Sequence, residues 1–501
     1  MPSPPALFKP TLILHGGAGA MHRSALPPPL WSKYQSSLLS YLRSTKHLLD
    51  TGATALDAAV HAVSLMEDDE LFNCGRGSVF TSAGTIEMEA SVMVTSVDSE
   101  RQREKNEGEM KRGAGVICIR NVRHPIQLAR EVLLRTGQDE DGNPVKDGSG
   151  GGGSMHCQLS GPYVEDLARA WGLERMPDEW FWTERRWEEH RRGLEKGSGS
   201  RTEISESAPA PASMLDDDLE IDYPSQGTVG CICLDQWGGL AVATSTGGRT
   251  NKFPGRVGDT PTLGAGFWAE GWEVDALGGD GDTPLPMHSS DEMRYASQPC
   301  PENMGMRGGK SIWDMTLGDC FQSLLSTIFG YTPRRTTFEQ STPLLHQHRY
   351  DTKQPSRNSD QKHPHHSRRP RKRRAAAVSG TGSGDSFLRT AAARTTCAMM
   401  RFSPNELSLA DAVSAVAGPD GELQRSAGRR WGRTAEGQGG MIGIEAEVDV
   451  EVDDGREVAT GLRRGKIVFD FNCGGMFRAW FDQDADGNDV ERAMVFKEEY
   501  E

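Results

Sequence analysis

The stretch GTVGCICLDQWGGLAVATSTGGRTNKFPGRVGDTPTLGAG, residues Gly227–Gly266, is the part of the sequence that decides the fold. Two apolar runs, Gly227–Asp235 and Leu240–Ser245, flank a Gly-Gly turn, and this pattern predicts a buried β-hairpin. The preceding residues 195–226 are rich in Ser, Pro, Gly and Asp, which predicts a loose loop. A buried strand therefore begins where a polar segment ends.

Outward from this hairpin, strands lead each half of the chain, helices lie between them, and several strands are joined by hairpins. Glycine runs at Gly16–Ala20 and Val378–Asp385 predict turns, and the composition of residues 137–154 predicts a linker. This order favours an α+β layered sandwich over a doubly wound sheet. The further predicted strands are Pro10–His15, Thr85–Thr95, Gly113–Arg120, Gly440–Glu445 and Lys466–Phe471, the last two ending the core, and the predicted helices are Trp31–Thr51, Ala53–Glu67, His124–Thr136, Ser311–Phe329, Ser386–Phe402 and Leu407–Ala417.

Charge and cysteine content narrow the class of protein. The 501 residues carry a net charge of −15, which argues against a general nucleic-acid binder. Nine cysteines without CxxC spacing predict neither a zinc site nor a disulfide framework, and favour a reducing compartment. The first residues lack the pattern of a signal peptide, and no apolar run reaches the length of a membrane span. We therefore expect a cytoplasmic protein without a membrane partner.

The common catalytic motifs are missing, so the chemistry is sought at Gly227-Thr228. The sequence has no convincing GxSxG, P-loop or HExxH motif. A threonine exposed as a new N-terminus has an α-amine with a pKa of about 8, which can take the proton of its own hydroxyl. The simpler alternative is that Gly-Thr only starts a strand, and on the dipeptide alone this alternative is favoured.

Several further motifs, taken in their order along the chain, favour the threonine nucleophile over an ordinary strand start. The sequence resembles the plant-type L-asparaginase and isoaspartyl peptidase family of N-terminal-nucleophile hydrolases, which implies a four-layer αββα sandwich. The resemblance also implies one catalytic domain cut into residues 1–227 and 228–501. The motifs that carry it are HGGAG (His15–Gly19), LFNCGRGSVFTSAGTIEMEAS (Leu71–Ser91), TERRW (Thr183–Trp187), Gly227–Gly266, VSGTGSGD (Val378–Asp385), GQGGMIG (Gly437–Gly443) and FNCGGMFRAW (Phe471–Trp480).

The catalytic residues follow position by position from this resemblance. Thr228 matches the nucleophile that is released by cleavage after Gly227. Thr246 matches the threonine that hydrogen-bonds the nucleophile and assists cleavage. Thr381 and Gly382 match the pair that stabilises the oxyanion with a hydroxyl and a backbone N–H. Taken singly, Thr246 is more simply an ordinary strand residue, and Thr381 and Gly382 fit a helix N-cap turn, which is compatible with anion binding.

The substrate-binding residues follow in the same way. Arg256 matches the guanidinium that holds an α-carboxylate, and Asp259 the carboxylate that holds the α-ammonium. Gly384 matches a further substrate contact, and Asn73 lies in the loop beside the site. In the family this loop often binds a structural sodium ion, whose ligands here would be the backbone carbonyls of Met66, Glu67, Asp69, Phe72, Cys74 and Arg76.

The implied reaction is acyl transfer to threonine. The hydroxyl attacks the side-chain amide of asparagine or the isopeptide bond of a β-aspartyl dipeptide, and water releases aspartate. The resemblance implies no metal or organic cofactor for this chemistry. It also implies a small-molecule or dipeptide substrate, no nucleic-acid partner, and a dimer of processed heterodimers.

Some features depart from the family pattern. Glu89 and Asp385 replace the usual Asp and Glu, and Gly380 and Ser383 flank Thr381 in place of Cys and Thr. Larger is an insertion predicted at 271–376, for which a lid, a partner-binding module or a disordered loop are all open. Its basic run RRPRKRR, Arg368–Arg374, resembles a nuclear localisation signal, with a solvated loop as the alternative.

Three rival functions remain at this point. GFWAE, Gly266–Glu270, is reminiscent of threonine aspartase, a protease of the same superfamily, although Asp259 favours a small substrate with a free amine. Glycosylasparaginase is disfavoured because Gly227 stands where that enzyme carries Asp. An inactive scaffold that uses the insertion is the third alternative.

Overall fold

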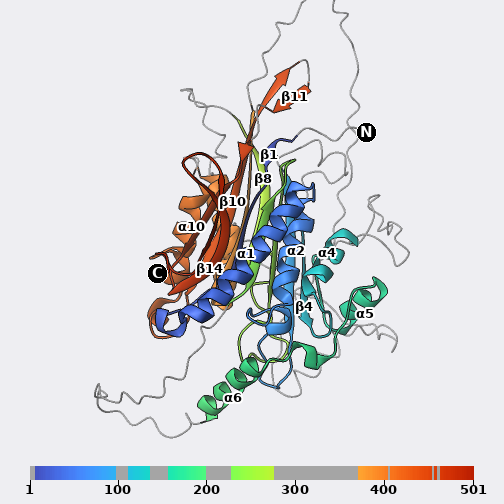
Figure 1. Cartoon of the computed structure of the whole chain (residues 1–501), viewed down its shortest axis with the longest axis vertical. Coiled ribbons are helices and arrows are strands. Elements are labelled where there is room, and N and C mark those ends of the chain that lie inside the picture. The colour runs from blue at the N-terminus through green and yellow to red at the C-terminus, as the bar shows by residue number, and fades with distance from the viewer. Residues whose placement is uncertain are drawn as a thin grey trace, which may run out of the picture. The chain divides into compact units, whose positions relative to one another are not determined.

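The computed structural model describes residues 6–96, 111–135, 156–198, 227–275, 371–403, 407–453, 456–459 and 463–500 (Figure 1). These residues all belong to one compact unit, formed by Met1–Leu277 and Arg368–Glu501. The second unit, Gly278–Ser367, lies outside the described residues. The linker predicted at 137–154 and the helix predicted at Ser311–Phe329 lie outside them too.

An eight-stranded sheet contains the predicted hairpin near its centre. Its neighbouring strands are antiparallel except for the last pair, β4 and β5, which is parallel. In spatial order the strands are β15 (Asp489–Met494), β14 (Gly475–Gln483), β2 (Thr11–Gly19), β6 (Val229–Leu234), β7 (Gly239–Thr246), β3 (Met88–Ser96), β4 (Arg112–Ile119) and β5 (Gln158–Ser160).

A second sheet of five strands is antiparallel throughout, with β10 at its branching point. Its strands are β11 (Arg456–Ala459), β10 (Gly439–Asp453), β9 (Arg371–Gly382), β8 (Phe267–Asp275) and β13 (Lys466–Phe471). Separately, β1 (Phe8–Lys9) pairs in parallel with β12 (Arg463–Arg464).

Several helices begin where the sequence supplies a cap or a first-turn proline. Thr54 caps α2 by accepting from the N–H of Asp57, and Ser408 caps α10 by accepting from that of Asp411. The helices are α1 (Pro28–Asp50), α2 (Ala55–Glu67), α4 (Pro125–Arg135), α5 (Pro162–Ala170), α6 (Glu184–Ser198), α8 (Gly384–Thr390), α9 (Ala392–Phe402), α10 (Leu409–Ala417) and α11 (Glu422–Ser426), with 3-10 turns at Arg23–Ala25, Gly75–Gly77, Asp178–Phe181 and Gly428–Arg430. None of these helices is both long enough and apolar enough to span a bilayer.

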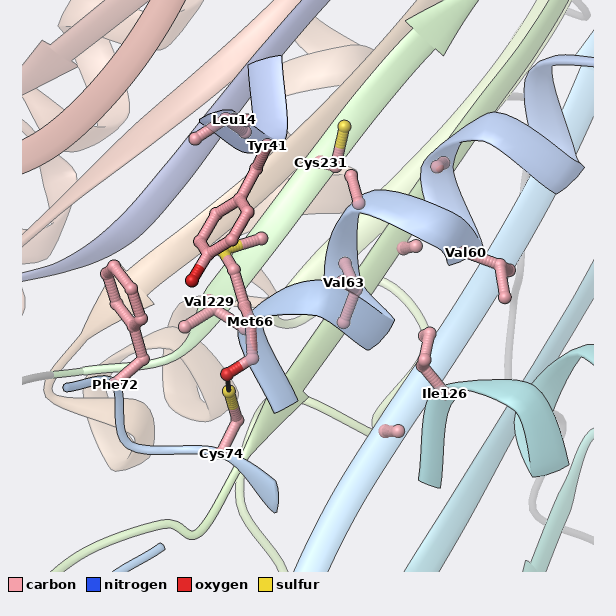
Figure 2. Close-up of a cluster of buried hydrophobic side chains, with 14 of the residues drawn as sticks. Leu14, Tyr41, Val60, Val63, Met66, Phe72, Cys74, Ile126, Val229 and Cys231 are labelled. Carbon is pink, nitrogen blue, oxygen red and sulfur yellow. Dashed lines mark hydrogen bonds between the residues drawn. The ribbon is translucent and has the colours of Figure 1, made fainter. Parts of the chain in front are cut away.

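Alternation along the strands divides the core into three clusters. Leu12 and Leu14 of β2 pack with residues of α1, α2 and α4, whereas Ile13 between them packs with residues of the second sheet. Figure 2 shows part of the first cluster, where side chains of α2 lie over Val229 and Cys231 of β6, and Ile126 at the start of α4 lies beside α2. The third cluster joins β9 and β10 to α8–α11. Both sheets are therefore buried on two faces.

The predicted strands are found, and so are the helices predicted on described residues, except that Ser386–Phe402 is divided into α8 and α9 at Ala391, whose backbone is left-handed. The core does not end at β13. Two more strands, β14 and β15, follow, and β14 pairs with β2 near the start of the chain. Both glycine runs predicted as turns are largely strand ends, because Gly16–Gly19 belong to β2 and Val378–Gly382 to β9. The loop predicted at 195–226 begins inside α6, and its residues from 199 onward lie outside the described part of the chain.

The predicted insertion is shorter at both ends than expected. Residues 271–275 continue β8 and residues 371–376 begin β9, and these segments pair from Gly271 with Ala375 to Asp275 with Arg371. The missed signal is the segment Trp272–Val274, which pairs with the basic residues Lys372–Arg374. Residues 276–370 lie outside the described residues.

The basic run at Arg368–Arg374 is not the exposed signal that nuclear import requires. Its last four residues lie in β9, and the side chains of Arg373 and Arg374 are buried. Arg374 binds the carboxylate of Glu445 at 2.7 Å, and Lys372 lies 3.1 Å from that of Glu447. Nuclear localisation is therefore not supported.

Candidate active site

A cavity of about 470 Å³ opens at the start of β6 and the ends of β2, β7 and β9. Every catalytic or substrate-binding residue expected from the sequence lines it, apart from Thr381, which precedes the lining residue Gly382. Helix α6 adds a wall that the sequence did not predict. The expected residues in the lining are Asn73, Gly227, Thr228, Thr246, Arg256, Asp259, Gly382 and Gly384, and those from α6 are Arg186, Glu189, Arg192 and Gly193.

Thr228 is buried at the mouth of β6, and its hydroxyl has a partner that the sequence did not suggest. Thr228 Oγ1 lies 2.9 Å from Thr260 Oγ1, so one hydroxyl donates to the other. Thr246 stands at the same end of the β6–β7 hairpin, but its hydroxyl accepts from the N–H of Gly248 at 3.0 Å. The hydrogen bond expected between Thr246 and Thr228 is thus made by Thr260 in this structure.

Thr381 and Gly382, the expected oxyanion pair, lie against Gly227, the residue that precedes Thr228. A β-carbon built on Gly227 would lie 2.4 Å from Thr381 Oγ1 and 3.0 Å from the nitrogen of Gly382. Thr381 Oγ1 also accepts from the N–H of Ala18 at 3.2 Å, which fixes its position at the end of β2. Gly227 therefore sits beside the groups able to stabilise negative charge on a carbonyl oxygen.

The expected substrate-binding pair is arranged around one further carboxylate. Arg256 donates to Asp385 at 2.9 Å, and Arg249 donates to the other oxygen of Asp385 at 3.3 Å. Burial opposes ionisation of Asp385, but these arginines outweigh it and lower the pKa of its carboxyl. A β-carbon on Gly384 would lie 2.4 Å from Asp259 Oδ1, so glycine keeps the space beside Asp259 open.

Asp259 is buried, and Oδ2 has no hydrogen-bond partner in the described structure. Burial raises the pKa of this carboxyl to about 7, against the opposing charge of Arg256. An orphaned carboxylate oxygen facing a cavity is suited to bind an ammonium group of a ligand.

Glu89 is a further site residue, which the sequence singled out only as a departure. It is buried on β3 and lines the cavity, and its carboxylate accepts from the N–H of Gly258 at 2.8 Å. Burial raises the pKa of Glu89 although Lys252 and Arg256 oppose the shift. Glu89 thereby holds the backbone next to Asp259 in place.

A polar pair below β6 was also not predicted as a pair. His15 Nε2 lies 2.7 Å from Ser379 Oγ, and burial lowers the pKa of His15 to about 3, so the ring is neutral. A β-carbon on Gly230 would lie 2.4 Å from Ser379 Oγ and 2.5 Å from His15 Nε2. Glycine at this position lets β2, β6 and β9 approach one another under the site.

Asn73 connects the loop of Leu71–Ser78 to the end of β7. Its side chain donates to the carbonyl of Gly248 at 2.8 Å and accepts from the N–H of Val79 at 3.1 Å. The N–H of Gly247 donates to the backbone carbonyl of Asn73. Asn73 thus positions the cavity wall that it also lines.

The loop expected to bind sodium folds tightly around its own carbonyls. Met66 O accepts from the N–H of Asp69 and from the thiol of Cys74, the latter drawn as a dashed line in Figure 2. Gly75 and Gly77 lie so close to the carbonyls of Glu67 and Phe72 that no β-carbon would fit. Each carbonyl has a second lone pair, so the loop retains oxygen donors of the kind a hard cation prefers. The described residues hold no cluster of three His, Cys, Asp or Glu side chains able to bind a metal.

Comparisons with known proteins agree with this geometry and confirm the resemblance seen in the sequence. The family model described as "Asparaginase" matches residues 8–140 and 152–290, more than half of the chain. The chain is 33% identical over 266 residues to the Isoaspartyl peptidase of Escherichia coli, covering 53% of this chain and 70% of the relative. The Isoaspartyl peptidase of Salmonella typhimurium is equally similar, with 53% and 71% covered. The Isoaspartyl peptidase/L-asparaginase of Bos taurus is 32% identical over 263 residues, with 52% and 68% covered. The match of the family model to more than half of the chain, together with these relatives, shows that the chain belongs to the asparaginase family.

Proposed function

We propose that this chain cuts itself between Gly227 and Thr228 and then hydrolyses L-asparagine, β-aspartyl dipeptides or both. The observation that carries this proposal is the cavity itself. It gathers Thr228, Arg256, Asp259 and Gly382 from segments far apart in the chain, and Gly227 still lies against the oxyanion groups. Relatives named for isoaspartyl peptidase and L-asparaginase support the same reaction class.

Self-cleavage begins with attack of Thr228 Oγ on the carbonyl carbon of Gly227. The hydroxyl of Thr381 and the N–H of Gly382 stabilise the oxyanion that forms. The C–N bond then breaks, its nitrogen takes the hydroxyl proton, and an ester links Gly227 to Thr228 Oγ. Water hydrolyses this ester, which leaves a carboxylate on Gly227 and a free α-amine on Thr228.

Substrate hydrolysis uses the same groups a second time. Arg256 holds the α-carboxylate of the substrate and Asp259 its α-ammonium, which directs the side-chain carbonyl to Thr228. The α-amine of Thr228 takes the hydroxyl proton and passes it to the departing amine. A β-aspartyl ester remains on Thr228 Oγ, and water converts it to aspartate. No step of this proposal uses a metal or organic cofactor.

The proposal extends to the architecture and the assembly. The three core clusters support a four-layer αββα sandwich, with helices on the outer face of each sheet. Residues 1–227 and 228–501 would be the two subunits of one catalytic domain. Two such processed heterodimers would pair, and light scattering of the cleaved protein measures this directly.

A structural sodium ion belongs to the proposal as well. The carbonyls of Met66, Glu67, Asp69, Phe72, Cys74 and Arg76 would hold it, and the ion would fix the loop that carries Asn73. Replacing sodium by choline in the buffer should then lower the melting temperature, with lithium as a size control.

The experiment that tests the function is intact-mass analysis of the purified protein. We expect fragments 1–227 and 228–501 from the wild type and an uncut chain from Thr228→Ala. The cleaved protein should release leucine from β-Asp-Leu or ammonia from asparagine. An uncut, inactive wild type would contradict the proposal, and efficient cutting of Thr228→Ala would place the nucleophile elsewhere.

The threonine aspartase alternative loses its sequence signal in the structure. Glu270, the acid of the GFWAE segment, is buried on β8 and binds Lys111, Arg394 and Arg401 within 3 Å. These contacts explain the segment as part of the core. Cleavage of an intact protein after internal aspartates, without activity on β-Asp-Leu, would restore the protease alternative.

A further inference from the structure

The first cleavage requires a partner for the Thr228 hydroxyl other than the α-amine. Until the bond to Gly227 breaks, the nitrogen of Thr228 is an amide, whose lone pair is delocalised and does not take up a proton. The group that orients the hydroxyl in the uncut chain must therefore come from elsewhere. This question rests on the proposed self-cleavage at Gly227-Thr228.

Thr260 is the residue that meets this requirement. Its hydroxyl lies 2.9 Å from that of Thr228, in a buried position, and it follows Asp259 directly in the chain. The hydroxyl of Thr246, the residue implied by the family resemblance, is engaged with the N–H of Gly248 instead.

The position of Thr260 is fixed by contacts from two strands. Its backbone carbonyl accepts from Ser91 Oγ of β3 at 2.6 Å and from Thr244 Oγ1 of β7 at 3.4 Å. Ser91 and Thr244 are themselves 2.7 Å apart. Because β3 pairs with β7 and β7 pairs with β6, these contacts anchor the backbone of Thr260 to the sheet that carries Thr228.

We propose that Thr260 is a positioning residue for self-cleavage, which holds the Thr228 hydroxyl for attack on Gly227. Thr228 donates its proton to Thr260 Oγ1 in a hydrogen bond, which leaves the lone pairs of Thr228 Oγ directed at the carbonyl carbon. The hydrogen bond breaks as the new C–O bond forms, and the proton goes to the nitrogen that leaves Gly227. Thr260 ends the step unchanged, and the α-amine takes over in later turnovers.

The test compares three variants of the full chain by following the loss of uncut protein with time. Thr260→Val keeps the shape but removes the hydroxyl, and we expect cleavage to slow roughly tenfold or more. Thr260→Ser restores the hydroxyl and should cut at close to the wild-type rate. Thr396→Val is the matched control, because it removes a buried hydroxyl that bonds only within α9 and the side chain of Met441.

Two further readouts separate positioning from loss of structure. The uncut Thr260→Val protein should melt within a few degrees of uncut Thr228→Ala. Hydroxylamine, which cleaves esters, should not restore cutting of Thr260→Val, because the slowed step precedes the ester.

The outcomes that overturn the inference differ from those that overturn the function. Wild-type cutting by Thr260→Val, with Thr228→Ala intact, would remove Thr260 from the mechanism and leave the proposed function standing. Restoration by hydroxylamine would assign Thr260 to ester hydrolysis instead. If the wild type itself stays uncut, the proposed function and this inference fail together.

Discussion

Among single residues, the candidate site depends on a few buried polar groups. Asp259 has one oxygen without a partner, while Glu89 uses one of its oxygens to hold the N–H of Gly258. Arg256 is already bound to Asp385, so under the proposed function the α-carboxylate of a substrate shares or replaces that contact. The proposed substrate recognition then rests on ionic groups with restricted access to water, whose protonation matters near neutral pH.

The first prediction at this scale concerns the pH dependence of ligand binding. Burial raises the pKa of Asp259 to about 7, so the carboxyl is neutral below that pH and loses its attraction for an ammonium group. We expect the preference for aspartate over succinate, which lacks the ammonium, to fall by about tenfold per pH unit below pH 7. Inhibition constants of both ligands, measured from pH 5.5 to 8.5, give this ratio, and the amine of Thr228 affects both ligands alike.

Asp259→Asn is the control for that measurement. It should bind aspartate no better than succinate across the whole pH range. A ratio that stays constant with pH in the wild type would show that Asp259 does not hold the ammonium group.

At the scale of elements, the ends of strands carry the site and the charged residues between strands and helices fix their packing. Glu270 on β8 binds Arg394 and Arg401 of α9 and Lys111 next to β4. Arg374 of β9 binds Glu445 of β10, which also accepts from the N–H of Leu409 at the start of α10. Buried carboxylates thus tie the second sheet to the helices that cover it.

The prediction at this scale is that Glu270→Gln destabilises the fold. It leaves Lys111, Arg394 and Arg401 without their common anion, and we expect a loss of about 2 kcal/mol in the free energy of unfolding. The three cations are partly exposed, which keeps the loss below that of a fully buried pair. Urea unfolding in the uncut Thr228→Ala background measures it.

A surface ion pair supplies the control for this loss. Asp50→Asn removes the i,i+4 contact with Lys46 and should change stability by less than about 0.5 kcal/mol. Equal effects of the two substitutions would contradict a structural role for Glu270.

Across the whole molecule, strands from before and after the proposed cut lie side by side in the eight-stranded sheet. Three pairs of neighbouring strands join one fragment to the other. Strand β2, before the cut, lies between β14 and β6, both after it, and β7 pairs with β3. The two fragments therefore alternate within one sheet. Their separation would expose both buried faces of several strands at once.

This arrangement predicts that the fragments stay together after cleavage. The cleaved protein should elute from a sizing column as one species, in the same volume as uncut Thr228→Ala, and should separate into two chains only in denaturant. Separation of residues 1–227 from 228–501 in native buffer would contradict the sheet order.

The central hairpin, the family and most of the residues expected to line the cavity are predictable from the sequence. Apolar alternation in Leu240–Ser245 is a local property, and the motifs around Thr228, Arg256 and Asp259 lie within one continuous stretch. The residues that form the cavity were therefore predictable wherever a motif carried them.

Three features arise from tertiary contacts: which glycines form turns, which arginines are exposed, and which hydroxyl contacts that of Thr228. Gly16 and Gly380 lie in strands, where glycine is needed because the rings of Phe72 and Phe387 occupy the space of a side chain. The sequence alone does not distinguish a glycine required by close packing from one that forms a turn. Arg374 belongs to a basic run that resembles an exposed signal, but its guanidinium is paired with Glu445 of β10. Thr260 meets Thr228 across 32 residues because three strands fix their distance, and such contacts arise from packing between segments rather than from local pattern.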